Sequence, residues 1–351
     1  MPLRVKAGYD GLAILMTTRT TYPITSIGAP LAEMLPQTGR WGTVFAVFQR
    51  SCYLESVDGQ VFCLADHRSG EGPLTLGIGL PPNATMSSLG VGEGCQLETD
   101  GGFLRLGRTS VLSTAKAIIW EPEPVGPTAA QDEILHRLDT LINLVTPLIP
   151  SDGLACVIPN TAGIADGEPP QVDTENPALI LAIPRLCRLS EGLVHSEPET
   201  IDRAVTGLLG LGPGLTPSGD DLLGGLLVAL RAMPQTASHL IVDVLAGCVT
   251  RHAANKTTRI SSAMLEQSAR GNGSAAQHRL LRCLLGADSR SDISSAVLEQ
   301  IQVGHTSGWD TLAGLSLGIH LGLKMGQIHS SSDLSLVPPF ALKPEAAGIP
   351  A

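Results

Sequence analysis

Short apolar runs separated by turns predict a set of β-strands between Trp41 and Trp120. The runs are rich in β-branched and aromatic residues, and Asp58-Gly59 and Asp100-Gly-Gly102 are typical of the tight turns that join hairpin strands. Because no strong helical period lies between the runs, we expect a small antiparallel sheet or barrel. The predicted strands are residues 43–48, 52–54, 60–64, 74–78, 103–106 and 117–120.

The spacing of apolar residues changes after the proline-rich segment 121–127, which can neither continue a strand nor start a helix early. From Gln131 onwards, apolar residues recur at steps of three and four, as on one face of an amphipathic helix. A polar stretch with Pro and Gly, 149–176, predicts a loop. The predicted helices are residues 131–148, 178–189, 199–209, 219–232, 238–253, 258–269, 275–285, 292–302 and 308–324.

The change from strand to helix pattern predicts an α+β fold with a domain boundary in the proline-rich segment. We expect a β-rich N-terminal domain at residues 1–125, a mainly α-helical ligand-binding domain at 126–330 and a flexible tail at 331–351. The length of 351 residues suits two domains, because a domain averages about 150 residues.

Composition narrows the class of protein. The formal net charge is −10 and the sequence has no Lys/Arg cluster, which argues against a nucleic-acid partner. The chain has 7 cysteines without CxxC spacing, a pattern that predicts buried free thiols in a reducing cytoplasm. No apolar run has the length of a signal peptide or a transmembrane helix, so we expect a soluble, cytoplasmic protein without a membrane partner.

The most informative segment is a Gly- and hydroxyl-rich turn, Gly210-Leu-Gly-Pro-Gly-Leu-Thr-Pro-Ser-Gly-Asp-Asp221, which runs into an apolar helix. A shorter copy, Gly304-His-Thr-Ser-Gly-Trp-Asp310, begins the last predicted helix. The two copies align when a one-residue gap is allowed at Pro217. The aligned pairs are Thr216 with Thr306, Ser218 with Ser307, Gly219 with Gly308, Asp221 with Asp310 and Gly225 with Gly314.

These two turns predict binding of small anions at two helix N-termini. The first N–H groups of a helix lack internal partners and carry partial positive charge, so they attract phosphate or carboxylate groups. Glycines let a ligand approach the backbone closely. A structural alternative remains open, because Ser218-x-x-Asp221 and Ser307-x-x-Asp310 both fit a capping box. The predicted binding residues here are Gly214, Thr216, Ser218, Gly219, Asp221, Thr306, Ser307, Gly308 and Asp310.

Glycines inside the two helices predict that the helices lie side by side. Gly224, Gly225, Gly314 and Gly318 each cost up to about 1 kcal/mol relative to Ala, and close helix packing would explain their presence. Such packing would bring both N-termini to one shared pocket. The alternative is tight core packing without a ligand site.

A third polar segment, Asn255-Lys-Thr-Thr-Arg-Ile-Ser-Ser262, lies between two predicted helices. Its ammonium, guanidinium and hydroxyl groups suit carboxylate or phosphate oxygens. The alternative is an ordinary capped helix start. The site residues predicted from this segment are Lys256, Thr258, Arg259 and Ser261.

Acid–base and metal chemistry have weaker signals. His305 and His252 are candidate proton-transfer groups because imidazole titrates near neutral pH, although loop histidines also serve as simple hydrogen-bonding residues. Asp220, Asp221, Asp310 and His305 carry ligand atoms for Mg²⁺ or Zn²⁺, but no HExxH motif or ligand-pair spacing supports a metal site. We therefore predict no metal and no cofactor. The sequence also lacks a GxSxG elbow, a dinucleotide fingerprint and a Walker A loop.

The strings Gly212-Pro-Gly-Leu-Thr-Pro-Ser-Gly-Asp-Asp221, Thr258-Arg-Ile-Ser261 and Gly304-His-Thr-Ser-Gly-x-Asp310, behind a β-rich part that contains Pro82-Asn83, resemble the AllH family. The resemblance covers roughly residues 42–323. The best-known member of that family is a subunit of the oxamate carbamoyltransferase of anaerobic allantoin degradation, a branch of purine catabolism. The resemblance implies carbamoyl transfer between oxalurate and phosphate, giving oxamate and carbamoyl phosphate, in a complex with two other kinds of subunit.

On this hypothesis the partners are a small anionic substrate and the other carbamoyltransferase subunits. The predicted catalytic residues are Arg259, which would neutralise an anion, and Asp220 or His305, which would transfer a proton. One alternative is a non-catalytic metabolite-binding or scaffold subunit whose partners carry the chemistry. Another is an independent metal-dependent hydrolase or kinase-like enzyme.

Overall fold

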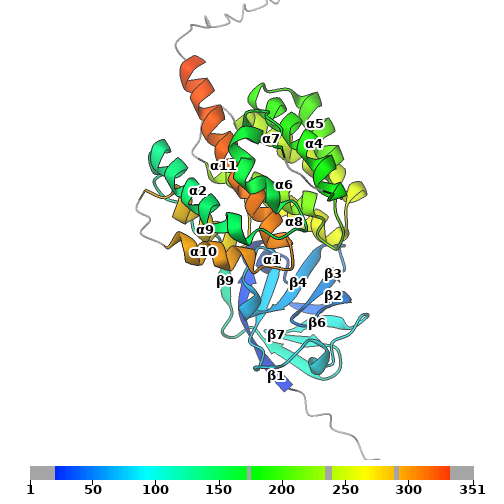
Figure 1. The fold of residues 1–351 in the computed structure, drawn as a ribbon. Helices are drawn as coiled ribbons and strands as arrows, with labels where there is room; N and C mark the ends of the chain where they lie inside the picture. Colours follow the sequence, from blue (N-terminus) through cyan, green and yellow to red (C-terminus); the bar gives the residue numbers. More distant parts are fainter. Residues whose placement is uncertain (1–19, 172–174, 234–238, 288–291, 333–351) are drawn as a thin grey trace, which may run out of the picture. The chain divides into compact units, whose positions relative to one another are not determined.

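The computed structural model describes residues 20–171, 175–233, 239–287 and 292–332. Internal contacts divide the chain into two compact units, Met1–Pro122 and Glu123–Ala351, which are β-rich and helical respectively (Figure 1). The predicted α+β class is confirmed. The predicted domain limits at residues 125 and 330 stay predictions. The predicted flexible tail begins at residue 331, and from residue 333 onwards it lies outside the described residues.

In its described part, the first unit forms one sheet with the strand order β5-β4-β3-β2-β6-β7-β8-β1-β9. An additional pairing of β1 with β5 closes the sheet into a barrel, and β9 pairs with β1. A short helix, α1 (Ala29–Glu33), follows the first strand. The strands are β1 (Thr20–Gly28), β2 (Thr38–Val47), β3 (Ser51–Ser56), β4 (Val61–Asp66), β5 (Thr75–Ile78), β6 (Gln96–Asp100), β7 (Phe103–Leu106), β8 (Ser110–Ser113) and β9 (Ile118–Trp120).

The predicted barrel is present, and three of its strand pairs are parallel. Strand β1 runs parallel to β8 and to β9, and β4 runs parallel to β5. Parallel neighbours need a long crossover rather than a hairpin, and local apolar spacing carries no information about strand direction. The sequence analysis also missed β1, β6 and β8 as strands.

Alternate side chains fill the interior of the barrel. Burial alternates along β3 and β7, where every second residue points inward, as expected for strands with one face on a core. Trp41 and Phe62 are both buried, and their rings stack with centroids 4.5 Å apart. Aliphatic residues such as Leu54, Leu97 and Leu112 complete this core.

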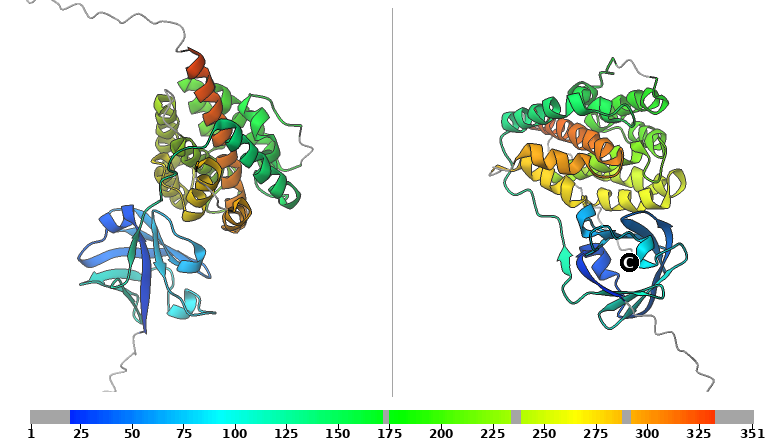
Figure 2. Two further views of the ribbon diagram at one scale, coloured as in Figure 1. Left: turned by 90° about the vertical axis from the view of Figure 1, so that its left-hand side faces the viewer. Right: turned by 60° about the horizontal axis from the view of Figure 1, so that its bottom comes forward.

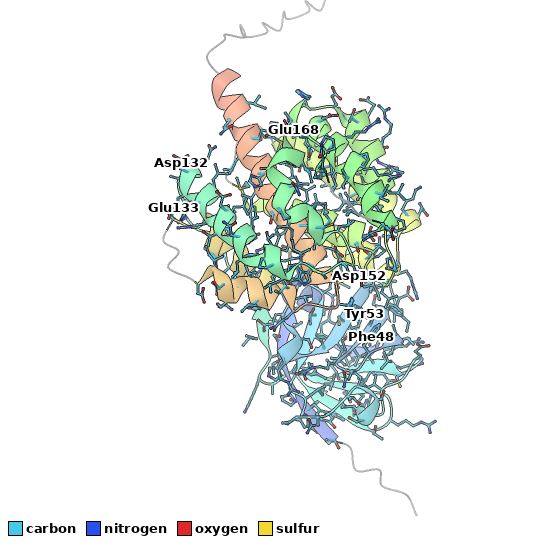
Figure 3. All side chains as sticks on the ribbon, viewed as in Figure 1. Phe48, Tyr53, Asp132, Glu133, Asp152 and Glu168 are labelled. Carbon is cyan, nitrogen blue, oxygen red and sulfur yellow. The ribbon has the colours of Figure 1, made fainter. Side chains whose placement is uncertain are left out.

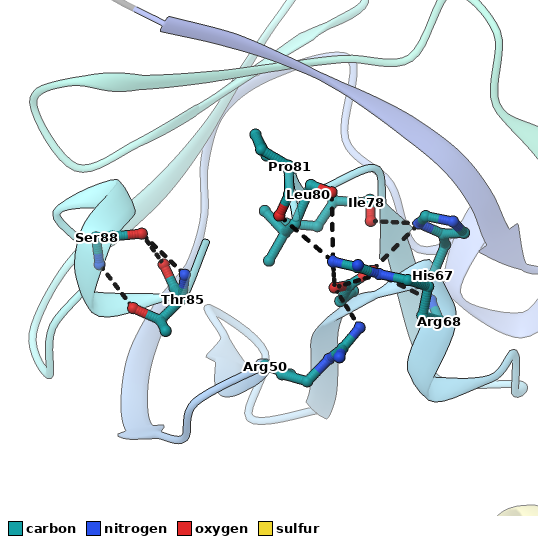
Figure 4. A network of polar contacts seen from close by, with 9 residues as sticks. Arg50, His67, Arg68, Ile78, Leu80, Pro81, Thr85 and Ser88 are labelled. Carbon is teal, nitrogen blue, oxygen red and sulfur yellow. Dashed lines mark hydrogen bonds and ion pairs between the residues drawn. The ribbon is translucent and has the colours of Figure 1, made fainter. Parts of the chain in front are cut away.

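A polar network anchors the end of β4 (Figure 4). The Asp66 side chain is 0% exposed and accepts hydrogen bonds from Arg50 Nη2 at 2.7 Å and Arg68 Nη2 at 2.6 Å. Burial raises the pKa of Asp66, but the hydrogen bonds from Arg68 and the charges of both arginines outweigh it, so that the pKa lies below its usual range. His67 Nδ1 lies 3.2 Å from the same carboxyl.

The second unit contains, as far as it is described, ten α-helices and two 3₁₀ segments. The predicted helices are all present, and 275–285 has the predicted limits. The segment 149–176, predicted as loop, also contains η4 (Ala155–Asn160) and α3 (Thr161–Ala165), which pack on α11. The other elements are α2 (Gln131–Val145), η3 (Thr146–Leu148), α4 (Pro177–Val194), α5 (Pro198–Leu208), α6 (Ser218–Ala232), α7 (His239–Lys256), α8 (Arg259–Ala269), α9 (Ala275–Leu285), α10 (Ile293–Ile301) and α11 (Ser307–Ser332).

Helix α11 occupies the middle of the helical unit, where α3, α4, α6 and α10 contact it (Figure 2). Nearly every residue of α6 and of the first half of α11 is buried, which explains why both read as continuous apolar runs. All 7 cysteines are free thiols, five buried and two half-buried. Across the described ranges, none of the helices has the length and apolar character to span a bilayer.

Candidate functional site

Helices α6 and α11 pack through their glycines in a reciprocal way. A Cβ on Gly225 would press on the backbone of Thr311 and Leu315, and a Cβ on Gly314 would press on the backbone of Leu222 and Leu226. In the aligned copies Leu222 corresponds to Thr311 and Leu226 to Leu315. Each glycine therefore packs against the equivalent residues of the opposite helix. The two helices are related by a local two-fold arrangement.

The Gly-rich turns that start these helices meet. The hydroxyls of Thr216 and Ser307 are hydrogen-bonded at 2.8 Å, although the two residues lie 91 positions apart in the sequence. The predicted side-by-side packing of the helices thus brings both turns to one place. The capacity of this place to bind a ligand depends on the geometry of its individual groups.

Each turn interacts with the aspartate of the other copy. The pKa of Asp221 is well above its usual range because of burial; the hydroxyls of Ser307 and Thr216 lower it, and the charge of Asp310 raises it. For Asp310, burial also raises the pKa, whereas the Leu154 N–H and the Ser218 and Thr306 hydroxyls lower it. The aspartates therefore face hydroxyls across the helix pair.

This crossed arrangement corrects the capping-box alternative at α6. The N-cap position is Pro217, no side chain caps the helix, and Ser218 is already the first helical residue. In a capping box the Ser occupies the N-cap position itself, and the acid three residues later lies in the first turn of the same helix. The Ser–x–x–Asp spacing here instead connects two helices that begin side by side.

Gly219 and Gly308 do not present their N–H groups to a ligand as predicted. The Gly219 N–H donates to Leu211 O, and the Gly308 N–H donates to Val303 O, both at 2.9 Å. A Cβ on either glycine would collide with a backbone carbonyl of the preceding segment, Leu208 or Gln300. These glycines are required for the close approach of each helix start to the chain before it.

Sequence analysis missed a third segment of the site, the turn between α2 and η4. Leu154 N–H donates a 2.6 Å hydrogen bond to Asp310 Oδ1. Gly153, at φ +78°, lies so close that a Cβ there would stand 2.6 Å from the same oxygen. Asp152, labelled in Figure 3, is the exposed residue just before this contact. Ser151-Asp-Gly153 carries a turn signal, but nothing in it indicates its partner.

Asp220 connects the first turn to the start of α8. Its carboxylate is 1% exposed and accepts hydrogen bonds from Gly210 N at 2.8 Å, Ser261 Oγ at 2.6 Å and the Thr257 hydroxyl. Burial raises its pKa and these three donors lower it, with a net rise. The predicted segment 255–262 is thus adjacent to the first turn.

Five other predicted residues have different environments. Thr258 caps α8 by accepting from Ser261 N, and its hydroxyl donates to Leu215 O of the first turn. Lys256, Arg259 and His305 are exposed. Gly214 is also exposed, at φ +98°, with open space where a Cβ would be.

His252 lies in a different part of the helical unit, beside Asp202. Its Nε2 atom lies 2.9 Å from Asp202 Oδ1, which also accepts from Arg251. Asp202 lines a cavity of about 870 Å³ between α5 and α7, with Arg203 and Cys248 in its wall. A smaller cavity of about 350 Å³ lies between α7 and α8. Neither cavity contains residues of the two turns, so the predicted shared pocket is not one of these two cavities.

In the part of the chain that the structure describes, no group of three or more His, Cys, Asp or Glu gathers as a metal cluster. The chemistry of the turn pair is instead that of hydroxyls, carboxylates and exposed cations. These are the groups that bind and orient small polar ligands.

The fold and site define an α+β protein whose two Gly-rich helix starts meet through an internal repeat. The family model described as oxamate carbamoyltransferase subunit AllH matches residues 208–319, a span that contains both turns and the start of α8. This match supports the assignment of residues 208–319 to the AllH family. No solved structure matches the chain.

Proposed function

We propose that this chain is a subunit of a carbamoyltransferase of the oxamate type and that it binds small anions over the paired turns. The match of residues 208–319 to the AllH family model supports the reaction class. The observation that carries the location is the 2.8 Å hydrogen bond between Thr216 and Ser307, which makes one site out of two distant sequence motifs.

The reaction joins oxalurate and phosphate. A phosphate oxygen attacks the ureido carbonyl carbon, a C–O bond forms, and the C–N bond to the oxamate nitrogen breaks. That nitrogen takes a proton as oxamate leaves, and carbamoyl phosphate remains. Positioning two anions and stabilising the charge on the carbonyl oxygen are the main tasks, and fixed donors and cations perform both.

We assign these tasks to the predicted residues according to their exposure and hydrogen bonding. Arg259 and Lys256 are exposed beside the first turn and would neutralise the anions. His305 is exposed in the second turn and would donate the proton. Asp220 is buried with three donors, so we assign it the positioning of the turn and of α8 rather than proton transfer.

Two variants at opposite ends of α8 test the location. Arg259→Ala should lower kcat/KM for oxalurate about 10- to 100-fold, the equivalent of one charge-assisted contact. Arg270→Ala, an exposed arginine at the other end of α8, is the control and should leave it unchanged. The measurement is phosphate-dependent carbamoyl phosphate formation by the chain reconstituted with the subunits encoded beside it.

The same assay separates the alternatives. We expect the chain to be inactive alone and required in the complex, since the family name describes a subunit. Full turnover by the isolated monomer would refute the multi-subunit part. If turnover needs the chain but does not change in Arg259→Ala and His305→Gln, the chain is a scaffold and the chemistry belongs to its partners. The variant Gly219→Val does not test ligand binding, because it disrupts the packing against Leu208.

A further inference from the structure

The buried aspartates below the paired turns have unused hydrogen-bonding capacity. Asp310 is 0% exposed, and its Oδ1 atom accepts from Leu154 N. In the described chain, its Oδ2 atom and Asp221 Oδ2 are buried without a hydrogen-bond partner. Most buried carboxylate oxygens in proteins are satisfied, because an unpaired one costs on the order of 1 to 3 kcal/mol. Two such oxygens at matching positions of a repeat therefore need an explanation.

Protonation alone does not supply one. A protonated carboxyl carries an O–H donor that in turn needs an acceptor. A hydrogen bond between the two carboxyls would satisfy both, but none joins them among the described residues. The two carboxyls stand at matching positions of the helix starts that meet at the 2.8 Å hydrogen bond between Thr216 and Ser307. A positive ion between them would satisfy both oxygens at once.

We propose that Asp221 and Asp310 together bind one Mg²⁺ ion at the point where the two helix starts meet. Mg²⁺ prefers oxygen ligands, keeps several of its waters, and is commonly held by one or two carboxylates together with a substrate phosphate. The surrounding groups are oxygen donors: the hydroxyls of Thr216, Ser307 and Ser218. A thiol or imidazole site for a softer metal is not built here, in agreement with the missing cluster of three such ligands among the described residues.

The ion would also resolve an electrostatic conflict in the anion site. Two buried carboxylates below the turns oppose a phosphate above them, and the N–H groups of Gly219 and Gly308 are used internally. A divalent cation between the carboxylates neutralises their two negative charges. This inference does not depend on the proposed carbamoyl transfer, since ion binding is measured without phosphate or oxalurate.

The test is Mn²⁺ binding to the full chain, followed by electron paramagnetic resonance and competed with Mg²⁺. We expect one saturable site at millimolar or lower concentration. Asp221→Asn and Asp310→Asn should each weaken it about 10- to 100-fold, the loss of one charge-assisted contact. The control is Asp132→Asn, an exposed acid in the first turn of α2 (Figure 3), which should bind as the parent does.

If the two aspartates only stabilised the fold, thermal unfolding of the variants would give a different result. Both Asn variants are isosteric and remove a buried negative charge, so with chelator their thermal unfolding midpoint should equal or exceed that of the parent. Mg²⁺ should then raise the midpoint of the parent and of Asp132→Asn only.

A measurement on the unmodified chain keeps the inference testable if a variant fails to fold. Fe²⁺ placed at the site, with ascorbate and hydrogen peroxide added to generate hydroxyl radicals there, should cleave the backbone near Gly153, Thr216 and Thr306. Absence of saturable binding, equal binding by the Asn variants, or cleavage elsewhere would overturn the Mg²⁺ site. Ion binding without any effect on phosphate affinity would leave this inference intact and count against the anion site above it.

Discussion

The reciprocal glycine contact between α6 and α11 gives the sharpest expectation about stability, tested by Gly314→Ala. A Cβ on Gly314 would overlap Leu222 O and lie 2.8 Å from Leu226 N, whereas ordinary contact begins at 3.4 Å. Both obstacles are helix backbone, which has no rotamer to change. The closest contact, 1.9 Å to Leu222 O, falls 1.5 Å short of 3.4 Å, so the helices must separate. A gap of about 1 Å already forfeits about half of the dispersion attraction between facing atoms.

The expected net loss is about 2 kcal/mol. Overpacking costs up to about 3 kcal/mol at its usual upper end, and replacing a helical Gly by Ala returns about 1 kcal/mol. For a unit of this size, about 2 kcal/mol corresponds to a fall of about 4 to 8 °C in the unfolding midpoint. The assay is thermal unfolding of the full chain followed by circular dichroism at 222 nm, which reports mainly on the helical unit.

Gly247→Ala in α7 is the matched control. A Cβ there has nothing within 4 Å, so only the helix propensity changes, and the midpoint should rise by about 2 to 4 °C. The double variant Gly225→Ala with Gly314→Ala should lose less than the sum of the two single losses, because one separation of the helices relieves both contacts. A Gly314→Ala protein as stable as Gly247→Ala would refute the reciprocal packing.

Three further expectations concern buried polar groups. Burial and the charge of Arg282 lower the pKa of His278 to about 4, so the imidazole stays neutral in the folded chain. The free energy of unfolding should therefore fall by about 3 kcal/mol as pH drops from 6.5 to 4. His278→Gln should remove that acid-side loss, and His136→Gln, an exposed histidine, should not. Asp66→Asn should cost the β-rich unit about 2 kcal/mol by urea unfolding, since its arginines are half exposed; an unchanged midpoint would contradict this. Asp220→Asn places an amide donor against three donors and should destabilise the helical unit by about 2 kcal/mol, a loss that its midpoint in urea measures.

Much of the architecture follows from local sequence signals. Apolar spacing identified all the longer helices, the strands on both sides of Asp58-Gly59, and the proline-rich segment where one pattern replaces the other. The repeat of Gly, Thr, Ser and Asp indicated that α6 and α11 are equivalent, and the glycines inside them indicated close packing. These properties are local because they depend on the residue types within one element.

The tertiary structure decided which partner each group has. Leu154 and Gly153 contact Asp310 across more than 150 positions, and no local pattern pairs a turn with a distant carboxylate. The same holds for the parallel strands of the barrel, whose direction depends on crossovers.

The paired turns have both kinds of property, some set by the local sequence and some by tertiary contacts. The sequence by itself determined that two Gly-rich helix starts exist and that they carry hydroxyls and carboxylates. Only the packed chain decided that the N–H groups of Gly219 and Gly308 are used internally and that Asp221 and Asp310 each retain a buried oxygen without a partner. The physical reason is that hydrogen-bond satisfaction is a property of what surrounds a group in space, and residues distant along the chain supply those surroundings.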